Sequence, residues 1–208
     1  MLTFPEGFAM KTIVLAMAAI LVVPFLVHAE GGSSAAPVAA VSIKAEQQQA
    51  MEAVRALAGR LQGALKKAMK EGGPVHAIAV CNTRARAISE EIGSRRGLTV
   101  GRVSLKNRNP ANAPTAWEKK VLEEFEKEKR EGRPVASLTY AAVVRTASGR
   151  QFRFMKAIPT RAICTMCHGT DIAPAVKKEL DRLYPGDRAR GFRPGDIRGA
   201  FVVTRDIR

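Results

Sequence analysis

Two of the three cysteines and one of the three histidines lie together in the segment RAICTMCHGT, residues 161–170. The spacing of Cys164, Cys167 and His168 is the attachment signature of c-type haem. The two thiols can add to the two vinyl groups of a porphyrin, and the adjacent imidazole can then bind the iron as an axial ligand. The motif predicts one covalently bound haem c, with His168 as the proximal ligand of its iron.

Three other kinds of site use cysteines at this spacing. A thioredoxin-like redox pair does not require the adjacent histidine, and the sequence does not indicate the βαβ unit that usually carries it. A structural zinc site needs four ligands, and few further candidates are present. A disulfide between Cys164 and Cys167 would close a small, strained loop. Haem attachment accounts best for the three residues together.

The second axial position of such an iron has several candidate ligands elsewhere in the chain. Cys81 is the odd cysteine, and it can equally be a small buried hydrophobic residue of a helix. His76, Met155 and other methionines also carry suitable donor atoms, whereas His28 lies within the predicted leader. The residues by themselves do not choose among these candidates.

The N-terminal segment predicts export. A continuous apolar run, residues 12–27, follows Lys11 and is short for a membrane-spanning helix. It leads to small residues that are typical of a cleavage site after Ala29, so residues 1–29 are predicted to be a secretory signal peptide. Met10 is a more typical start for such a peptide than Met1. The alternative is an uncleaved peptide that anchors the protein to a membrane.

The chain is strongly basic, with 34 Lys and Arg against 19 Asp and Glu and a net charge of +15. In the cytoplasm this balance would suggest nucleic acid as a partner. In an exported, periplasmic protein we expect no nucleic-acid partner, and acidic proteins, anionic lipids or acidic small molecules fit better. Solvated surface charges explain the composition equally well.

Hydrophobic periodicity predicts an α+β fold, with helices first and then a small, mostly antiparallel sheet. A linker, residues 30–42, precedes the folded domain, which is predicted to cover 43–208. Helices are predicted at 43–71, 74–95, 115–130 and 173–184; strands are predicted at 97–104, in two segments of 134–159 around the turn TASG, and at 200–207. Cys81 falls in the middle of the second helix.

Four stretches are similar to a known family: CNTRARAIS (81–89), GRVSLKNRNPANAPTAWE (101–118), FRFMKAIPTRAICTMCHG (152–169) and YPGDRARGFRPGDIRGAF (184–201). The chain resembles the single-haem c-type proteins with a PAS-like fold, a family long described as a domain of unknown function. Its members occur as small exported proteins and as sensing portions of bacterial signalling proteins. The resemblance covers about residues 45–206.

The resemblance implies a PAS-like haem domain and an unusual pair of axial ligands, His168 and Cys81. It also implies redox or gas sensing, although the chain carries no output domain such as a kinase. We therefore expect a sensor of a diatomic gas or of redox state, and the alternative is a periplasmic electron-transfer cytochrome with a redox partner protein. A peroxidase-like enzyme would need a distal acid or base, for which only His76 is a candidate.

The loop 105–114 and the late loop 185–199 hold the remaining candidate residues. Arg108 could pair with a haem propionate. Asn109, Asn112 and Trp117 lie close to Arg108 in the sequence. The structural alternative for this group is that turns formed by the asparagines hold the connection in place. Four residues near the late loop could also reach propionates, although the glycines and prolines there favour turns: Tyr184, Asp187, Arg193 and Arg198.

Overall fold

The computed structural model describes residues 42–207. The predicted signal peptide with its cleavage site, the candidate start Met10, His28 and all but the last residue of the predicted linker lie outside the described residues. In the part of the chain that the structure describes, no helix has the length and apolarity needed to cross a membrane.

The N-terminal helix α1 (Ile43–Arg96) is bent in its middle, where the sequence predicts a break. Gly72 and Gly73 leave helical geometry, and Gly73 has a φ of +67°, which a glycine adopts without strain. Pro74 then starts the second half, where its missing amide hydrogen costs no helical bond. The predicted break between helices at 43–71 and 74–95 is confirmed, at Gly72 and Gly73.

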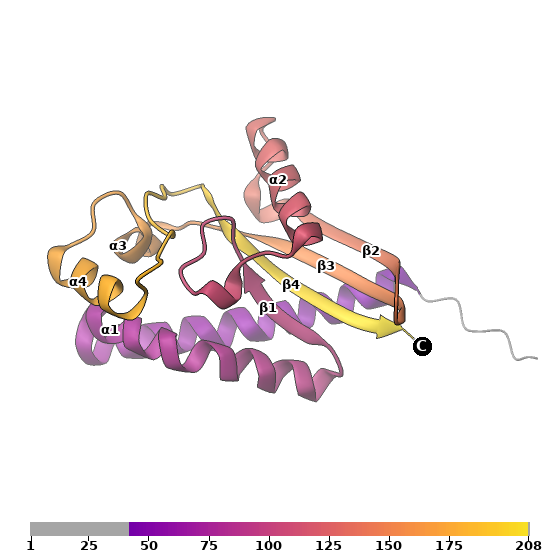
Figure 1. Ribbon diagram of the computed structural model, residues 1–208, viewed down its shortest axis with the longest axis horizontal. Helices are drawn as coiled ribbons and strands as arrows, with labels where there is room; N and C mark the ends of the chain where they lie inside the picture. The colour runs from indigo at the N-terminus through magenta and orange to yellow at the C-terminus, as the bar shows by residue number, and fades with distance from the viewer. Residues whose placement is uncertain (1–41, 208) are drawn as a thin grey trace, which may run out of the picture. The chain divides into compact units, whose positions relative to one another are not determined.

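The two halves of α1 lie antiparallel, as Figure 1 shows. An ion pair of 2.8 Å joins Arg60 in the first half to Glu91 in the second. Glu52 and Arg96 form a further pair of 3.5 Å at the open end of this helical hairpin. The bend therefore brings residues from the two ends of α1 to the same end of the molecule and leaves Cys81 near the bend.

Four strands form one antiparallel sheet in the order β1-β4-β3-β2. They are β1 (Thr99–Val103), β2 (Thr139–Thr146), β3 (Gly149–Pro159) and β4 (Ile197–Ile207). This confirms the α+β class and the predicted antiparallel sheet. The first strand of the hairpin starts later than the predicted residue 134, because Val135–Ser137 form a 3-10 turn, and β4 starts three residues before the predicted residue 200.

Side chains alternate between the two faces of the sheet, and a different helix covers each face. Phe154 and its neighbour Val203 belong to the core formed with α1. Met155 and Val202, one residue further along each strand, pack instead with α2 (Ala116–Arg130). Strict alternation along paired strands therefore produces a three-layer arrangement of helix, sheet and helix.

Helix α2 begins where the sequence predicts its capping box. The backbone amide of Thr115 donates to the Glu118 carboxylate at 2.7 Å, and the Thr115 hydroxyl donates to the same carboxylate at 2.8 Å. These bonds satisfy groups that a helix start leaves without partners.

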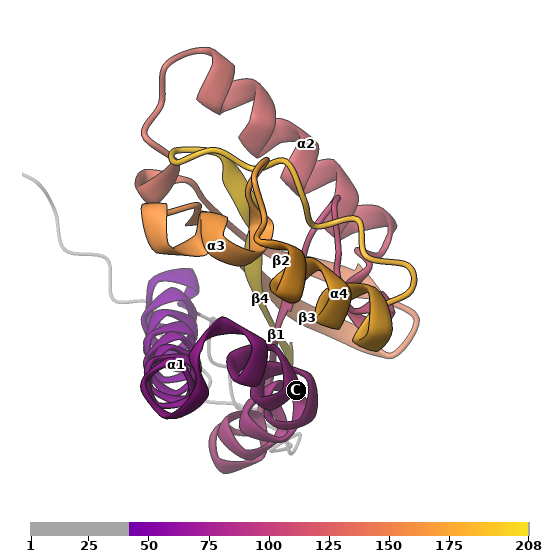
Figure 2. The same cartoon turned by 90° about the vertical axis from the view of Figure 1, so that its left-hand side faces the viewer.

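The segments around the cysteine motif lie beside one end of the sheet. Figures 1 and 2 show α3 (Thr165–His168) and α4 (Pro174–Leu183) above the bend of α1. Ile78 of α1 packs there with Val176 and Leu180 of α4, and Cys167 contacts the same cluster. This packing joins the second half of α1 to the motif.

We predict that Gly199→Ala destabilises the protein by about 2 kcal/mol or more. Gly199 has a φ of +152° beside an irregularity in the pairing of β3 with β4, and an added Cβ would collide with the Val103 carbonyl oxygen. Urea unfolding measures the loss. Gly101→Ala is the control, since its Cβ would meet only the Val202 side chain at 3.9 Å; equal stability losses in the two variants would contradict the prediction.

Candidate haem site

The predicted attachment motif forms two short helical turns after β3. Cys164 ends the 3-10 helix η3 (Ala162–Cys164), and Cys167 and His168 follow in α3. All three cysteines are free thiols, so the disulfide alternative does not describe this structure. Between residues 42 and 207, no cluster of three or more His, Cys, Asp or Glu side chains is arranged to hold a metal ion.

The imidazole of His168 is held by one backbone carbonyl. Its Nδ1 lies 2.8 Å from the Ala189 oxygen, which can only accept a hydrogen bond. Nδ1 therefore carries the hydrogen, and Nε2 keeps its lone pair. Burial holds the pKa of His168 well below its usual value, and repulsion from Arg198 and Arg108 lowers it further. At neutral pH the ring is uncharged and oriented, which is the state an imidazole needs to bind a metal.

The part of the late loop that precedes β4, residues 185–196, also binds the end of α3 through its backbone. The amide of Phe192 donates to the His168 carbonyl at 2.9 Å, and the amide of Gly191 donates to the Gly169 carbonyl at 2.9 Å. The Phe192 ring meets the His168 ring edge-on, with 6.3 Å between centroids. Together these contacts fix both the backbone and the ring plane of His168.

A buried carboxylate organises this loop. The Asp187 side chain is only 1% exposed and accepts hydrogen bonds from Arg108 Nε at 3.2 Å, Arg190 Nε at 2.9 Å and the Ala189 amide at 2.9 Å. Burial alone would raise the pKa of Asp187, but these hydrogen bonds outweigh it and the pKa is lowered. The carboxylate is therefore ionised at neutral pH, as its donors require.

Arg108 links three segments of the site. Besides Asp187, its guanidinium donates to the carbonyls of Cys167 and Ala189. The Ala189 oxygen is the same atom that holds His168 Nδ1. Arg108 thus connects the loop 105–114, the attachment motif and the late loop. These contacts give Arg108 a positioning role. Its predicted pairing with a haem propionate stays a prediction.

The asparagines of the loop 105–114 make turns, as their structural interpretation predicts. Asn109 Oδ1 accepts from the Ala111 amide at 2.9 Å, and the Asn112 carbonyl accepts from the Ser104 amide at 3.1 Å. The Trp117 ring lies under the Arg153 guanidinium at 4.8 Å. These residues therefore stabilise the loop 105–114 and α2, and the contacts described above are not with the attachment motif.

Cys81 lies on the second half of α1, close to the attachment motif. Its side chain is exposed to solvent, yet enough protein surrounds it for desolvation to raise its pKa, against the opposing effect of Arg102 and Arg108. Burial also raises the pKa of Cys167, and repulsion from Cys81 adds to this shift while Arg108 opposes it. The fold therefore brings the thiol of Cys81 within electrostatic reach of the motif.

The other candidate ligands lie in different surroundings. His76 is exposed, with its Nε2 3.9 Å from Glu71. Met155 is fully buried among the residues that pack between the sheet and α2. Arg84 and Arg86 are exposed on α1, and Arg86 pairs with Glu90 at 2.7 Å. The cations whose charges lower the pKa of Cys81 are Arg102 and Arg108.

Arg102 is a site residue that sequence reasoning missed. It lies on β1 opposite Phe201 of β4, two residues after the buried Val100 and therefore on the same face of the sheet. A charged residue at an inward position of an alternating strand was the available signal. Arg198, one of the late-loop candidates, lies on β4, and burial together with repulsion from Arg108 and Arg102 lowers its pKa to about 10.

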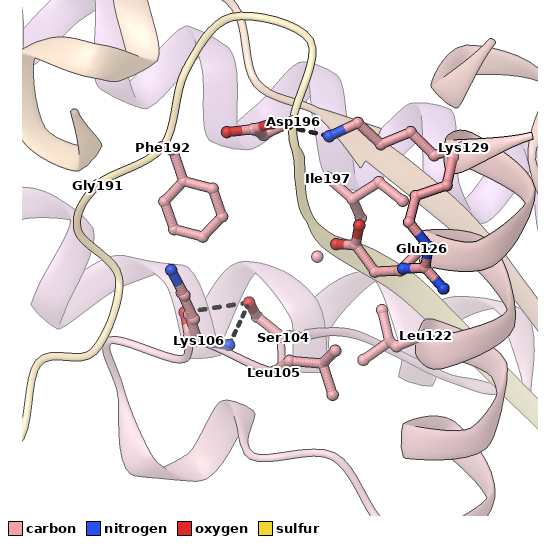
Figure 3. Close-up of a pocket in the computed structure, with 12 residues that line it drawn as sticks. Ser104, Leu105, Lys106, Leu122, Glu126, Lys129, Gly191, Phe192, Asp196 and Ile197 are labelled. Atoms are coloured by element: carbon pink, nitrogen blue, oxygen red, sulfur yellow. Dashed lines mark hydrogen bonds and ion pairs between the residues drawn. The ribbon is translucent and has the colours of Figure 1, made fainter. Parts of the chain in front are cut away.

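Two cavities lie outside this group of residues. One, of about 310 Å³, lies between α2 and the late loop, and Figure 3 shows the Lys129–Asp196 ion pair and Phe192 at its wall. The other, of about 290 Å³, lies between the bend of α1 and the start of α4, with Met166 at its edge. Neither cavity is lined by Cys81, Cys164, Cys167 or His168.

Comparison with known proteins gives two matches. The model of the Tll0287-like family (Tll0287) matches residues 35–205 of the chain. Among solved structures, the crystal structure of the cyanobacterial heme-protein Tll0287 is similar with a TM-score of 0.60 and 26% sequence identity, over 79% of this chain and 97% of that chain. A search of curated proteins found no significant match.

Proposed function

Because the chain belongs to the Tll0287-like family, we propose that it is a haem-binding protein with one haem c on Cys164 and Cys167. The similarity to a solved haem protein supports haem binding. The CxxCH spacing supports covalent attachment, and the proximity of Cys81 to the motif supports His168 and Cys81 as the axial pair.

The observation that carries the proposal is the state of His168. Its Nδ1 is bound to the Ala189 carbonyl, its ring is neutral and its Nε2 lone pair is free, beside two free thiols at the attachment spacing. The surroundings also fit a dianionic cofactor, because the Nε atom of Arg198 is buried without a hydrogen-bond partner. The donor set therefore matches a haem rather than a zinc ion.

A bound haem supplies one-electron chemistry and an axial position for small molecules. Cys81 is the residue that would control this position. Burial raises the pKa of Cys81 more than the charges of Arg102 and Arg108 lower it, so the thiol would be deprotonated only when it binds the iron. A thiolate binds ferric iron more strongly than ferrous iron, so Cys81 would leave on reduction or protonation and open the position to a diatomic gas.

Release of Cys81 from the iron would allow the second half of α1, which carries this residue, to change its position. The second half of α1 packs through Ile78 on α4, and α4 follows the attachment motif. A partner protein that binds α1 would detect this change of position. The proposed role is therefore that of a redox or gas sensor. In an electron-transfer cytochrome both axial ligands would stay in place. The predicted signal peptide supports a periplasmic location as part of this proposal, since haem c is assembled there.

The test of haem binding is the colour and mass of the exported protein, produced together with a cytochrome c maturation system. We expect a haem c absorption spectrum and the mass of the processed polypeptide plus one haem. A colourless product at the mass of the bare polypeptide would overturn the proposal.

We predict that Cys81→Ala shifts the oxidised absorption spectrum and raises the reduction potential by about 0.1 V or more, because the electron-donating thiolate is lost. Redox titration with optical detection measures both effects. His76→Ala is the control and should leave spectrum and potential unchanged. Unchanged spectra in Cys81→Ala would exclude Cys81 as a ligand.

Carbon monoxide separates the two candidate roles. We expect the reduced parent protein to bind the gas, as a sensor with a departing Cys81 would. A reduced protein that ignores carbon monoxide, while the Cys81→Ala variant binds it, would show that Cys81 stays bound and would favour electron transfer.

A further inference from the structure

The arginines around the motif outnumber the carboxylates that could pair with them. The buried carboxylate of Asp187 already accepts from Arg108 and Arg190. Arg190 also pairs with Asp181 at 2.5 Å. Within the described part of the chain, no ion pair joins Arg102 or Arg198 to a carboxylate.

Arg198 is held in place but incompletely paired. Its Nη1 donates to the Ser104 hydroxyl at 3.1 Å and the Lys106 carbonyl at 3.3 Å, and its guanidinium lies 5.1 Å from the centre of the Phe192 ring. Its Nε is buried and has no hydrogen-bond partner. A buried hydrogen-bond donor without an acceptor costs free energy, and the cost is larger when the donor belongs to a charged group. An acceptor bound at the Nε edge of this guanidinium would therefore be favourable.

Arg102 has even less compensation. It lies on β1, and among residues 42–207 no carboxylate is paired with it; desolvation lowers its pKa, and of the groups described there Cys81 and Tyr184 oppose this effect. A thiol and a phenol are both neutral at pH 7 unless a metal or another charge ionises them. Arg102 therefore carries a positive charge in a half-buried position without an anion of its own.

The two side chains also repel each other. Arg102 and Arg108 both lower the pKa of Arg198 by their charge, and Asp187, which already accepts from Arg108 and Arg190, offsets this only in part. Buried charges of one sign are normally offset by an anion, because the combined costs of desolvation and repulsion are otherwise large. Two uncompensated arginines therefore point to a ligand with two negative groups.

We propose that Arg102 and Arg198 bind the two carboxylates of the haem, while Arg108 acts as a positioning residue for His168. This inference rests on the proposed function. Arginine suits the task because its planar fork of donors pairs with both oxygens of a carboxylate. Arg108 has its Nε and Nη2 engaged by protein acceptors, whereas Arg198 keeps a buried donor free.

The experiment compares two forms of haem that differ only in these carboxylates. Haemin and haemin dimethyl ester are titrated into the full-length protein carrying Cys164→Ser and Cys167→Ser, so that binding is reversible and measured by absorbance. The variants Arg102→Gln and Arg198→Gln are made in this background. Arg153→Gln is the matched control, since Arg153 also lies over an aromatic ring, that of Trp117, but on another part of the sheet.

We expect each site variant to bind haemin about 10-fold or more weakly than the parent, the loss expected for a hydrogen bond to a charged group. The dimethyl ester should bind the parent and both variants with similar affinity, because it offers no carboxylate. Arg153→Gln should change neither affinity. Equal losses for haemin and its ester, or unchanged haemin affinity, would overturn the assignment.

Failure of the proposed function and failure of a variant to fold give different results in this experiment. A parent protein that binds neither form of haem would contradict the proposed function itself. Urea unfolding of the haem-free proteins checks the fold, and Arg102→Gln should be as stable as the parent or more stable, because it removes an uncompensated charge. If Arg198→Gln does not fold, the ratio of the two affinities in Arg102→Gln decides the proposal.

Discussion

Replacing both Cys164 and Cys167 by serine is expected to remove covalent haem completely. Serine hydroxyls do not form thioether bonds with the vinyl groups, whereas the two thiols lie at the attachment spacing on one pair of helical turns. Mass spectrometry of the exported protein should show the bare polypeptide, and any haem that remains bound should be extracted by acidified organic solvent. Haem that stays covalently linked in this variant would contradict the assignment.

Cys81→Ser is the matched control for covalent attachment. Cys81 is a free thiol on α1, outside the attachment spacing, so its replacement should leave unchanged the mass that covalent haem adds to the polypeptide. Loss of the covalent adduct in Cys81→Ser would show that the third cysteine takes part in attachment.

Asp187→Asn is expected to reduce the free energy of unfolding by about 3 kcal/mol. The carboxylate is almost fully buried and accepts from two arginines and one backbone amide. The amide of asparagine keeps the shape but removes the charge and presents a donor to other donors, so Arg108 and Arg190 lose their shared anion. Urea unfolding at pH 7 measures the loss. Asp181→Asn is the control, because its exposed pair with Arg190 is worth about 1 kcal/mol or less.

The same carboxylate predicts a dependence on pH. The pKa of Asp187 is lower in the folded protein than the ordinary aspartate value of about 3.9, so its contribution is present above that value and is lost as pH falls through the folded pKa. The parent should therefore lose stability on acidification below about pH 4, and Asp187→Asn should lose less over the same range. Parallel stability curves for the two proteins would contradict this role of Asp187.

Local signals in the sequence predicted the elements well. The glycines before Pro74, the capping box at Thr115 and the turn TASG each act within a few residues, and each ends or starts an element as expected. The strand starts were less accurate, because alternation of side chains does not reveal where backbone pairing with a neighbouring strand begins. In the segment before β2, the buried residues Val135 and Leu138 are three positions apart, and Val135–Ser137 form a 3-10 turn instead of a strand.

The candidate site was predictable only where its chemistry is local. Cys164, Cys167 and His168 are close in sequence, so their spacing alone indicates haem attachment. Arg102 and the Ala189 carbonyl carry no such signal, because an arginine on a strand and a backbone oxygen in a loop gain a role only from what lies opposite them. Asp187 was considered for the site, but its burial beneath Arg108 was not foreseeable from the loop composition.

The sequence by itself determined the attachment motif, the order of helices and strands and the break in the long helix, since these depend on neighbouring residues and on the regular period of each element. Only the tertiary structure decided that Cys81 lies near Cys167, that Ala189 selects the tautomer of His168 and that the buried Nε of Arg198 has no hydrogen-bond partner among the described residues. Such relations depend on how segments far apart in the chain pack together, and on the desolvation that packing imposes on charged groups.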